Sequence, residues 1–444
     1  MIHPYQHLTR IPTRCEWNRF ENYRRRIYNL QVNEEPHWDG LSTRVYQLLD
    51  LYFPNGSFLP NLQRLTCFID WEHCTWIKLF LSPSLLYIDL NTFENQPGTI
   101  GPILESLPME SLQALHLEDF PLDVTSVRTL SNCLLRLSGP LQDLITYHKI
   151  SDDAAIHISR LSNLRVLGIS FRDSNFTLPG ARDVFPSLKS LYAQVDDNLG
   201  WLGLLKDMRA GLKYLSISWA EGLIPPPDLT HQLVSALQTS GAQETLRVLR
   251  INASRPWDIS GTTMVPLLSL HNLTNLEIHT PCHTHACTFD LADSDVAQLA
   301  SSLRKLRTLI LGGPRCLHPP PGFTMDGLFF LSKCCPSLLD LGVHFNAPQS
   351  RIFSYPFDTD EGRVPIQHLF SRESNCNLRR LYVHELPFPT APNSVGIMTY
   401  FLIHLFPHLD TIAQTGSLSG LWAETQRGIQ AWQAFRRITV PAGS

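Results

Sequence analysis

The sequence predicts an α/β fold in which a short buried strand and a helix alternate many times along the chain. The first observation is a six-residue phrase, Leu-x-x-Leu-x-apolar, that recurs through most of the 444 residues. The second is its spacing, about 29 residues on average between Leu62 and Leu409. The third is that helical patterns fill the intervals. A repeat of this length and pattern is typical of parallel strands stacked side by side, each followed by a helix.

The phrase itself indicates which side chains form the core. Strand side chains alternate between two faces, so the first, fourth and sixth residues point inward and the residues between them point outward. Leu309 and Leu341, each the fourth residue of its copy, are therefore expected in the core. The clear copies begin at Leu85, Leu112, Leu164, Leu188, Leu212, Leu246, Leu273, Leu306, Leu338 and Leu378, and the fainter copies begin at Ile27, Leu62, Leu141 and Leu409.

Both ends of the intervals carry boundary signals. Many copies follow a proline and a small or polar residue, as in Pro60-Asn61 and Pro336-Ser337. Proline ends the preceding helix and favours extended backbone. The sequence therefore predicts a leucine-rich-repeat solenoid, a horseshoe with parallel strands on the concave face and helices on the convex face. Polar residues expected to cap the helices are Ser151, Asp228, Asp293 or Ser294, Thr324 and Ser394.

Three ranges are predicted along the chain: a helical lead-in at 1–58, the irregular repeats at 59–415, and a capping helix and tail at 416–444. The loops in the repeat range vary in length, and such loops contribute to binding in many solenoids or are surface drift.

The last range holds an amphipathic pattern between Leu421 and Arg437. A terminal repeat exposes its core unless something covers it, so this pattern predicts a cap. The alternative is a helix that binds a partner. The large apolar residues that this helix carries are Trp422, Ile429, Trp432 and Phe435.

Composition narrows the function classes. The formal net charge is −4, charged residues make up 17% and hydrophobic residues 43%. These values fit a folded chain with no general attraction to nucleic acid or membranes. No secretory signal or membrane-spanning apolar run is present, and the ten cysteines are scattered irregularly. We therefore expect an intracellular protein, cytoplasmic or nuclear, with no nucleic-acid or membrane partner and with reduced thiols.

The sequence contains no clear motif of a common enzyme class or of a structural metal site. No phosphate-binding loop, serine-hydrolase elbow or His-Glu-x-x-His helix is present. The best metal candidate is Cys282-His283-Thr284-His285-Ala286-Cys287, but its spacing differs from structural zinc sites and favours a polar loop. We predict no catalytic residue, no cofactor and no metal. An enzyme with an unrecognised site is the remaining alternative.

The outward residues of the strands are the better candidate site. Tyr, Trp and Arg are enriched at protein interfaces, because they bury area and keep a polar tip. Among the candidates, Tyr192, Tyr214 and Arg250 are expected to form one patch. Other outward residues include Tyr87, Asp89 and His116, and we expect Trp219 and His279 just beyond the ends of their strands. The predicted partner-binding residues are Tyr192, Tyr214, Trp219, Arg250, Glu277, His279, Arg380 and Tyr382.

Three segments resemble a known family. They are Trp17 to Leu30, reading Trp-Asn-Arg-Phe-Glu-Asn-Tyr-Arg-Arg-Arg-Ile-Tyr-Asn-Leu, then Leu59-Pro-Asn-Leu-Gln-Arg-Leu65, and Leu81-Ser-Pro-Ser-Leu85. Together they resemble the F-box/leucine-rich-repeat proteins abundant in mushroom-forming fungi. In that family the F-box binds the Skp adaptor of a ubiquitin ligase and the repeats bind the substrate. The resemblance thus implies a substrate-recognition role.

One departure from the family concerns the F-box, which should precede Trp17. The 16 residues before Trp17 are too few for that helical module, so it was lost or this chain is truncated at its start. We expect binding to the Skp adaptor only if an F-box precedes this chain. The expected function is a non-enzymatic scaffold for protein–protein interaction, similar to the substrate-recognition half of a ubiquitin-ligase receptor. The alternative is a repeat adaptor unrelated to ubiquitination.

Overall fold

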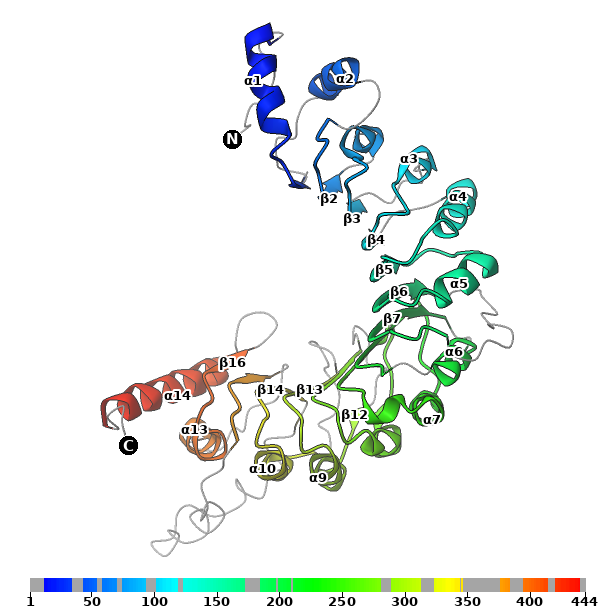
Figure 1. Cartoon of the computed structure of the whole chain (residues 1–444). Coiled ribbons are helices and arrows are strands. Elements are labelled where there is room, and N and C mark those ends of the chain that lie inside the picture. Colours follow the sequence, from blue (N-terminus) through cyan, green and yellow to red (C-terminus); the bar gives the residue numbers. More distant parts are fainter. Residues whose placement is uncertain are drawn as a thin grey trace, which may run out of the picture. The chain divides into compact units, whose positions relative to one another are not determined.

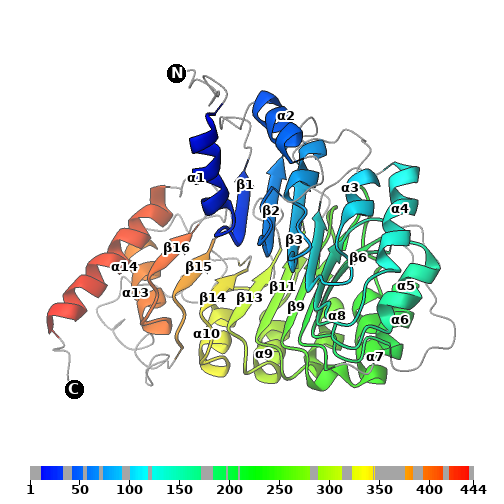
Figure 2. The same cartoon turned by 45° about the horizontal axis from the view of Figure 1, so that its top comes forward.

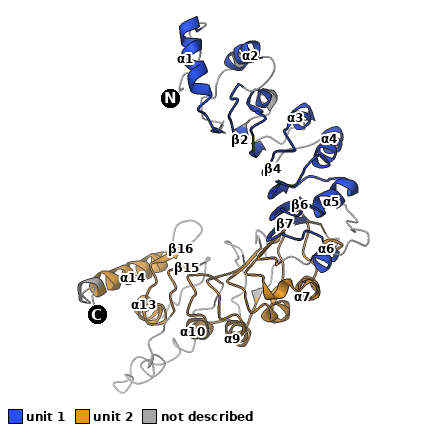
Figure 3. Cartoon of the chain, in the orientation of Figure 1, with its two compact units in different colours: residues 1–194, 203–210 blue, residues 195–202, 211–444 orange. Residues whose placement is uncertain are grey.

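The computed structural model describes residues 12–33, 43–53, 58–69, 74–92, 101–118, 123–171, 184–196, 199–208, 211–280, 289–312, 323–343, 345, 376–383, 394–413 and 420–439. The chain forms two compact units, residues 1–194 with 203–210 and residues 195–202 with 211–444 (Figure 3). This division falls inside the predicted repeat range, and the predicted limits at 58 and 415 stay predictions. Each unit is α/β, and each is described by itself.

In unit 1, strands β1 to β7 pair in the order of the sequence, and every pair is parallel (Figure 1). The strands are β1 (Asn29–Asn33), β2 (Arg64–Ile69), β3 (Tyr87–Thr92), β4 (Ala114–Glu118), β5 (Asp143–Thr146), β6 (Val166–Ser170) and β7 (Ser190–Val195). The helices are α1 (Arg14–Arg24), α2 (Thr43–Tyr52), the 3-10 helix η1 (Cys74–Phe80), α3 (Gly101–Ser106), α4 (Val124–Leu134) and α5 (Asp152–Ser159), and α6 (Trp201–Asp207) spans the division.

In unit 2, the main sheet again follows the sequence with parallel pairs, in the order β8-β9-β11-β13-β14-β15-β16. Its strands are β8 (Tyr214–Trp219), β9 (Val248–Asn252), β11 (Asn275–His279), β13 (Thr308–Leu311), β14 (Asp340–Gly342), β15 (Arg380–Tyr382) and β16 (Thr411–Ala413), and a small separate pair joins β10 (Ile259–Ser260) to β12 (Phe289–Asp290). The helices are α7 (Leu229–Ser240), η2 (Ala242–Glu244), α8 (Gly261–Met264), η3 (Val265–Ser269), α9 (Asp293–Ser302), α10 (Met325–Cys334), α13 (Ser394–Leu405) and α14 (Gly420–Thr439).

Within each unit the helices that connect the strands lie on one side of the sheet (Figures 1 and 2). In unit 1 these are α3, α4 and α5, and in unit 2 they are α7, α9 and α10. The outward residues of the strands occupy the opposite side, which no described helix covers. We call this side the open face of each unit.

The leucines of the repeated phrase form the core, as predicted. Leu309 is 1% exposed and Leu341 is fully buried. Leu309 pairs in register with Leu276 on one side and with Leu341 on the other. Equivalent leucines therefore stack from strand to strand, and each buried side chain contributes roughly 1.5–3 kcal/mol to stability.

A polar side chain in front of many strands holds the preceding copy of the repeat. In unit 1, Asn61 Nδ2 donates to the carbonyl oxygen of Arg25 at 2.7 Å, and Ser84 Oγ donates to that of Pro60 at 3.2 Å. In unit 2, Asn272 Nδ2 donates to the carbonyl oxygen of Glu244 at 2.9 Å. The polar residue of the Pro-Asn and Pro-Ser phrases thus links consecutive copies. The proline and the polar residue together mark the start of a strand.

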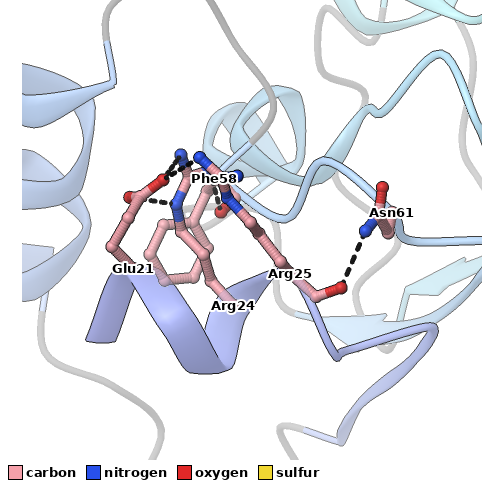
Figure 4. A network of polar contacts seen from close by, with 5 residues as sticks. All are labelled: Glu21, Arg24, Arg25, Phe58 and Asn61. Carbon is pink, nitrogen blue, oxygen red and sulfur yellow. Dashed lines mark hydrogen bonds and ion pairs between the residues drawn. The ribbon is translucent and has the colours of Figure 1, made fainter. Parts of the chain in front are cut away.

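Figure 4 shows this contact beside the first helix. Arg24 Nη2 donates to Glu21 Oε1 at 2.6 Å, and its Nη1 donates to the carbonyl oxygen of Phe58 at 3.1 Å. The neighbouring Arg25 accepts the bond from Asn61 through its backbone. The end of α1 is therefore tied to the segment that leads into β2.

The helix caps agree with the sequence at some positions and differ at others. The side chains of Ser151 and Thr324 accept backbone N–H groups at the starts of α5 and α10, as predicted. The prediction for α9 is wrong, because its N-cap is Ala292. Asp293 instead accepts from the backbone N–H and the hydroxyl of Thr324, both at 2.8 Å, so it joins neighbouring repeats.

Two further cap predictions also fail in detail. Asp228 precedes α7, but its side chain makes no capping hydrogen bond and accepts from Gln232 Nε2 at 2.6 Å. Ser394 is the first residue of α13 and is buried, rather than standing before the helix. Both residues mark helix starts correctly, although the expected capping contact is absent at Asp228.

The C-terminal helix α14 packs against the last strand of unit 2 through side-chain amides. Gln426 accepts from the backbone N–H of Ile412 and donates to the carbonyl oxygen of Asp410, and Gln433 donates to that of Leu409. These amides satisfy backbone groups at the edge that β16 presents. The capping role expected of 421–437 stays a prediction.

The apolar face predicted for α14 is only half buried. Trp422 and Ile429 are each 1% exposed, whereas Trp432 and Phe435 are 41% and 56% exposed. Helical periodicity turns Trp432 and Phe435 away from the face that carries Gln426, Ile429 and Gln433. Trp422 and Ile429 therefore lie on the buried side of the helix, and Trp432 and Phe435 lie on its exposed side.

A pair of adjacent residues tests the register of the repeat. Leu309→Asp should lower the free energy of unfolding by about 3 kcal/mol or more, because the change removes buried apolar area and buries an unpaired charge. Ile310→Asp, on the open face, should cost about 1 kcal/mol or less. Urea denaturation of both purified variants measures the difference. Equal losses at the two positions would contradict the register.

Candidate protein-interaction surface

Three neighbouring strands of unit 2 bring Tyr214, Arg250 and Glu277 together on the open face. The strand register places Arg250 of β9 directly beside Glu277 of β11. Arg250 Nη2 donates to Glu277 Oε1 at 3.0 Å, and Arg250 Nε lies 2.9 Å from Oε2. Arg250 Nη1 donates to the Tyr214 hydroxyl at 3.1 Å, with the guanidinium 5.7 Å from the ring centre. The guanidinium is thus held from two sides.

Glu277 is the anchor of this group, because it is only 7% exposed although it occupies an outward position. His279 Nε2 lies 3.5 Å from Glu277 Oε2. Burial alone would raise the pKa of Glu277, but the hydrogen bonds and charges of His279 and Arg250 outweigh it and hold the pKa below its ordinary value. Burial would lower the pKa of Arg250, yet the contact with Glu277 raises it. The pair is therefore ionised at neutral pH.

Asp340 and Arg380 form a second ion pair on the same open face. They are direct partners on β14 and β15. Arg380 donates through both Nε and Nη2 to the two carboxylate oxygens of Asp340, with the Nη2 contact at 2.8 Å. The Asp340 side chain is 14% exposed and that of Arg380 is 56% exposed. In both pairs the carboxylate is the more buried partner and the arginine faces the solvent.

Tyr382 lies beside this second pair, next to Gly342 in the register. A Cβ atom on Gly342 would lie 3.4 Å from both Ile310 and Tyr382, so the glycine brings these two side chains close. Tyr382 and Ile310 are partly exposed. They add apolar area beside Arg380.

The candidate residues divide between the two units. Tyr214, Arg250, Glu277 and His279 meet in unit 2, whereas Tyr192 lies on β7 in unit 1 beside Gly168. A single patch that also includes Tyr192 stays a prediction.

The prediction that Trp219 lies just beyond its strand is wrong, and its side chain is only 5% exposed. Trp219 is the last residue of β8, not a residue beyond it. Strand alternation therefore places it on the same inward side as Leu215 and Ile217. Sequence reasoning ended the strand too early, and this error moved the tryptophan to the wrong face.

The open face of unit 1 carries a different group. The Tyr87 hydroxyl lies 3.2 Å from His116 Nδ1, and Arg64 lies over the Tyr87 ring at 4.2 Å. Burial lowers the pKa of His116 and raises the pKa of Asp89, its direct neighbour in the register. The His116 side chain is thus neutral at pH 7, and it serves as a hydrogen-bond partner of Tyr87 rather than as a cation.

His148, just beyond β5, is a residue that no sequence pattern singled out. Its Nε2 is sealed from water and has no hydrogen-bond partner among the described residues. Burial lowers its pKa to about 4. A single histidine outside a motif gives no sequence signal, because its burial depends on the neighbouring repeats.

Metal binding has no geometric support in the described part of the chain, where no three His, Cys, Asp or Glu side chains gather closely enough to hold an ion. The Cys282 to Cys287 segment lies outside the described residues. Cys335 donates to the carbonyl oxygen of Ala300, and burial raises its pKa to about 12. This thiol is a core group and not a nucleophile.

No family model and no curated protein matches the chain. Among solved structures, a protein from Bacteroides fragilis, determined by a structural genomics consortium, is 16% identical over 58% of this chain and 68% of its own, with a TM-score of 0.28. A likeness this weak carries no argument about fold or function. No described helix is long and apolar enough to cross a membrane.

The buried histidine of unit 1 gives a pH prediction. Between pH 6.5 and 4.5 the unfolded chain binds a proton at His148 and the folded chain does not, so stability falls as the pH falls through this window. The loss at this one site should be about 2 kcal/mol at pH 4.5. His148→Gln should therefore show a smaller loss of stability than the wild type when urea unfolding is compared at pH 7 and 4.5. His157→Gln, a change of the same type in α5, should behave as the wild type does. An unchanged pH dependence in His148→Gln would refute the assignment.

Proposed function

We propose that this protein is a non-enzymatic leucine-rich-repeat scaffold that binds another protein on its open face, similar to the substrate-recognition half of an F-box ubiquitin-ligase receptor. The observation that carries the proposal is the group in unit 2 where Arg250 is held between Tyr214 and the buried carboxylate of Glu277. The face around it has no described helix above it.

The arrangement suits recognition because the arginine is ordered before a partner arrives. Glu277 and Tyr214 fix the guanidinium, so little side-chain entropy is lost on binding. The side chain of Arg250 is still 42% exposed and keeps N–H groups that neither residue uses. Arginine and tyrosine are also the residue types that most often dominate binding energy. Arg380, held by Asp340, repeats the same device on β15.

The link to ubiquitin ligases rests on the resemblance in residues 17–30 and on no contact in the structure. Two aromatic residues of that segment serve packing: Trp17 lies 4.4 Å from Tyr52 between ring centres, and Phe20 stacks on Phe58 at 5.1 Å. The alternative, a repeat adaptor without a role in ubiquitination, uses the same open face. Capture of the Skp adaptor by the full-length transcript product separates the two.

Partner binding should depend on the open face of unit 2. Once a partner is identified by proximity labelling in cells, the Tyr214→Ala/Arg250→Ala variant should bind it at least about 30-fold more weakly, because each anchor of this type contributes about 2 kcal/mol. The variant should stay folded at the assay temperature, although the buried Glu277 carboxylate loses its arginine partner and the melting temperature falls. Titration of the purified proteins by calorimetry measures the effect.

The matched control lies on the helix side of the same unit. Gln298 lies on α9 and Lys305 lies in the turn after it, and both are exposed. Gln298→Ala/Lys305→Ala should leave affinity unchanged within about twofold. Full affinity in the Tyr214/Arg250 variant, with loss in the helix-side variant, would place the binding site on the helix side.

A further inference from the structure

A second feature of unit 2 lies at the edge of the sheet where its strands begin. The residue that follows the first leucine of the phrase is basic in four copies: Lys213, Arg247, Arg307 and Arg379. We call these four residues the basic row. The copies between them carry Thr274 and Leu339 at this position, and the last copy carries Asp410. Unit 1 has Arg165 and Lys189 at the same place in its phrase.

Backbone hydrogen bonds align the basic row. The carbonyl oxygen of Lys213 accepts from Arg247 N at 2.9 Å and from Val248 N at 3.0 Å. The carbonyl oxygen of Arg307 accepts in the same way from Leu339 N at 2.7 Å and from Asp340 N at 3.0 Å. The pattern continues through every copy from Lys213 to Arg379. Since neighbouring strands lie about 5 Å apart, adjacent members of the row are about 5 or 10 Å apart.

The four cations have no counterion among the residues that the structure describes. All four side chains are exposed, and none forms an ion pair with a described residue. Arg250 and Arg380 of the same sheet differ, because Glu277 and Asp340 neutralise them. The whole chain has a formal net charge of −4, so the row is a local concentration of positive charge. Four like charges in line repel one another unless an anion lies along them.

We propose that the basic row binds an acidic segment of a partner polypeptide. Carboxylates two or three residues apart in an extended chain are separated by about 7 to 10 Å, which suits the spacing of the row. Three of its four members are arginines, whose planar guanidinium groups match carboxylates with two parallel hydrogen bonds. Each contact is added without breaking an existing ion pair.

A polypeptide fits this edge better than a nucleic acid. Single-stranded nucleic acids are bound by basic grooves that also offer aromatic rings for base stacking. The outward residues next to the row include Val248, Asn275 and Thr308, which have no ring. Tyr214 pairs with Val248 in the register, and the guanidinium of Arg250 lies against its ring, 5.7 Å from the ring centre.

This inference deepens the proposed function, because it names the chemistry of one part of the partner. It concerns the edge of the sheet, whereas the proposed function rests on Arg250 and Glu277 on the open face. The two are tested with different variants and different ligands. A partner that binds the open face but ignores the row would overturn only this inference.

The experiment measures fluorescence anisotropy with the full chain at low salt. The probes are a labelled peptide with four Glu-Gly-Ser repeats, its neutral counterpart with four Gln-Gly-Ser repeats, and an oligothymidylate of twelve nucleotides. The test variant changes Lys213, Arg247, Arg307 and Arg379 to Gln. The control variant changes four exposed basic residues elsewhere in unit 2 to Gln, namely Arg255, Arg304, Lys333 and Arg427. Both variants lose the same charge.

The inference requires that the acidic peptide bind the wild type at least about tenfold more tightly than the neutral peptide. The row variant should lose this advantage, and the control variant should keep it within about twofold. Equal losses in both variants would show that net charge alone attracts the peptide and would overturn the inference. Tighter, row-dependent binding of the oligothymidylate would also overturn it, in favour of a nucleic acid. If the fourfold variant fails to fold, Lys213→Gln/Arg247→Gln provides the same comparison against Arg255→Gln/Arg304→Gln.

Discussion

Burial of the same leucines in every copy of the repeat is the constraint on which the rest of the structure depends. Because strand side chains alternate, burying Leu276, Leu309 and Leu341 in line fixes which residues of each strand face outward. A slip of one residue would exchange the two faces, so the register is strongly specified. The polar links in front of the strands, such as Asn272 to the carbonyl of Glu244, fix the spacing between copies. This register fixes the positions of the residues that form both proposed binding surfaces.

The open face and the basic row illustrate two ways in which a repeat sheet presents charge. On the open face, the buried Glu277 carboxylate pairs with Arg250 and fixes the orientation of its guanidinium. The charges of the two side chains cancel, so this group contributes orientation rather than net charge. Along the edge, backbone hydrogen bonds fix the positions of Lys213 and its counterparts, and their side chains form no ion pair with another described residue. The first arrangement favours specific contacts with a partner, and the second favours attraction to an acidic one.

Much of the fold could be predicted from the sequence, because the phrase is local and repeats many times. The burial of Leu309 and Leu341 and the caps at Ser151 and Thr324 follow from alternation and from short-range hydrogen bonding. The wrong predictions concern residues whose positions depend on contacts between neighbouring repeats. Asp293 bonds to Thr324 of the next repeat, which no local pattern reveals. The outward position of Arg250 could be predicted, but its pairing with Glu277 required the strand register. The prediction for Trp219 was wrong because the neighbouring strands decide where a strand ends.

Neighbouring copies hold one another in register through the leucine core and the backbone links beside it. Native-state hydrogen exchange of unit 2 tests this most directly at the amides of Val248, Asn275 and Thr308, each of which donates to the carbonyl of the preceding copy. Strands that are stabilised together should exchange these amides slowly and with similar opening free energies, close to that of global unfolding. Exchange at the rate of an unstructured peptide, or with opening free energies that differ widely from strand to strand, would contradict the account.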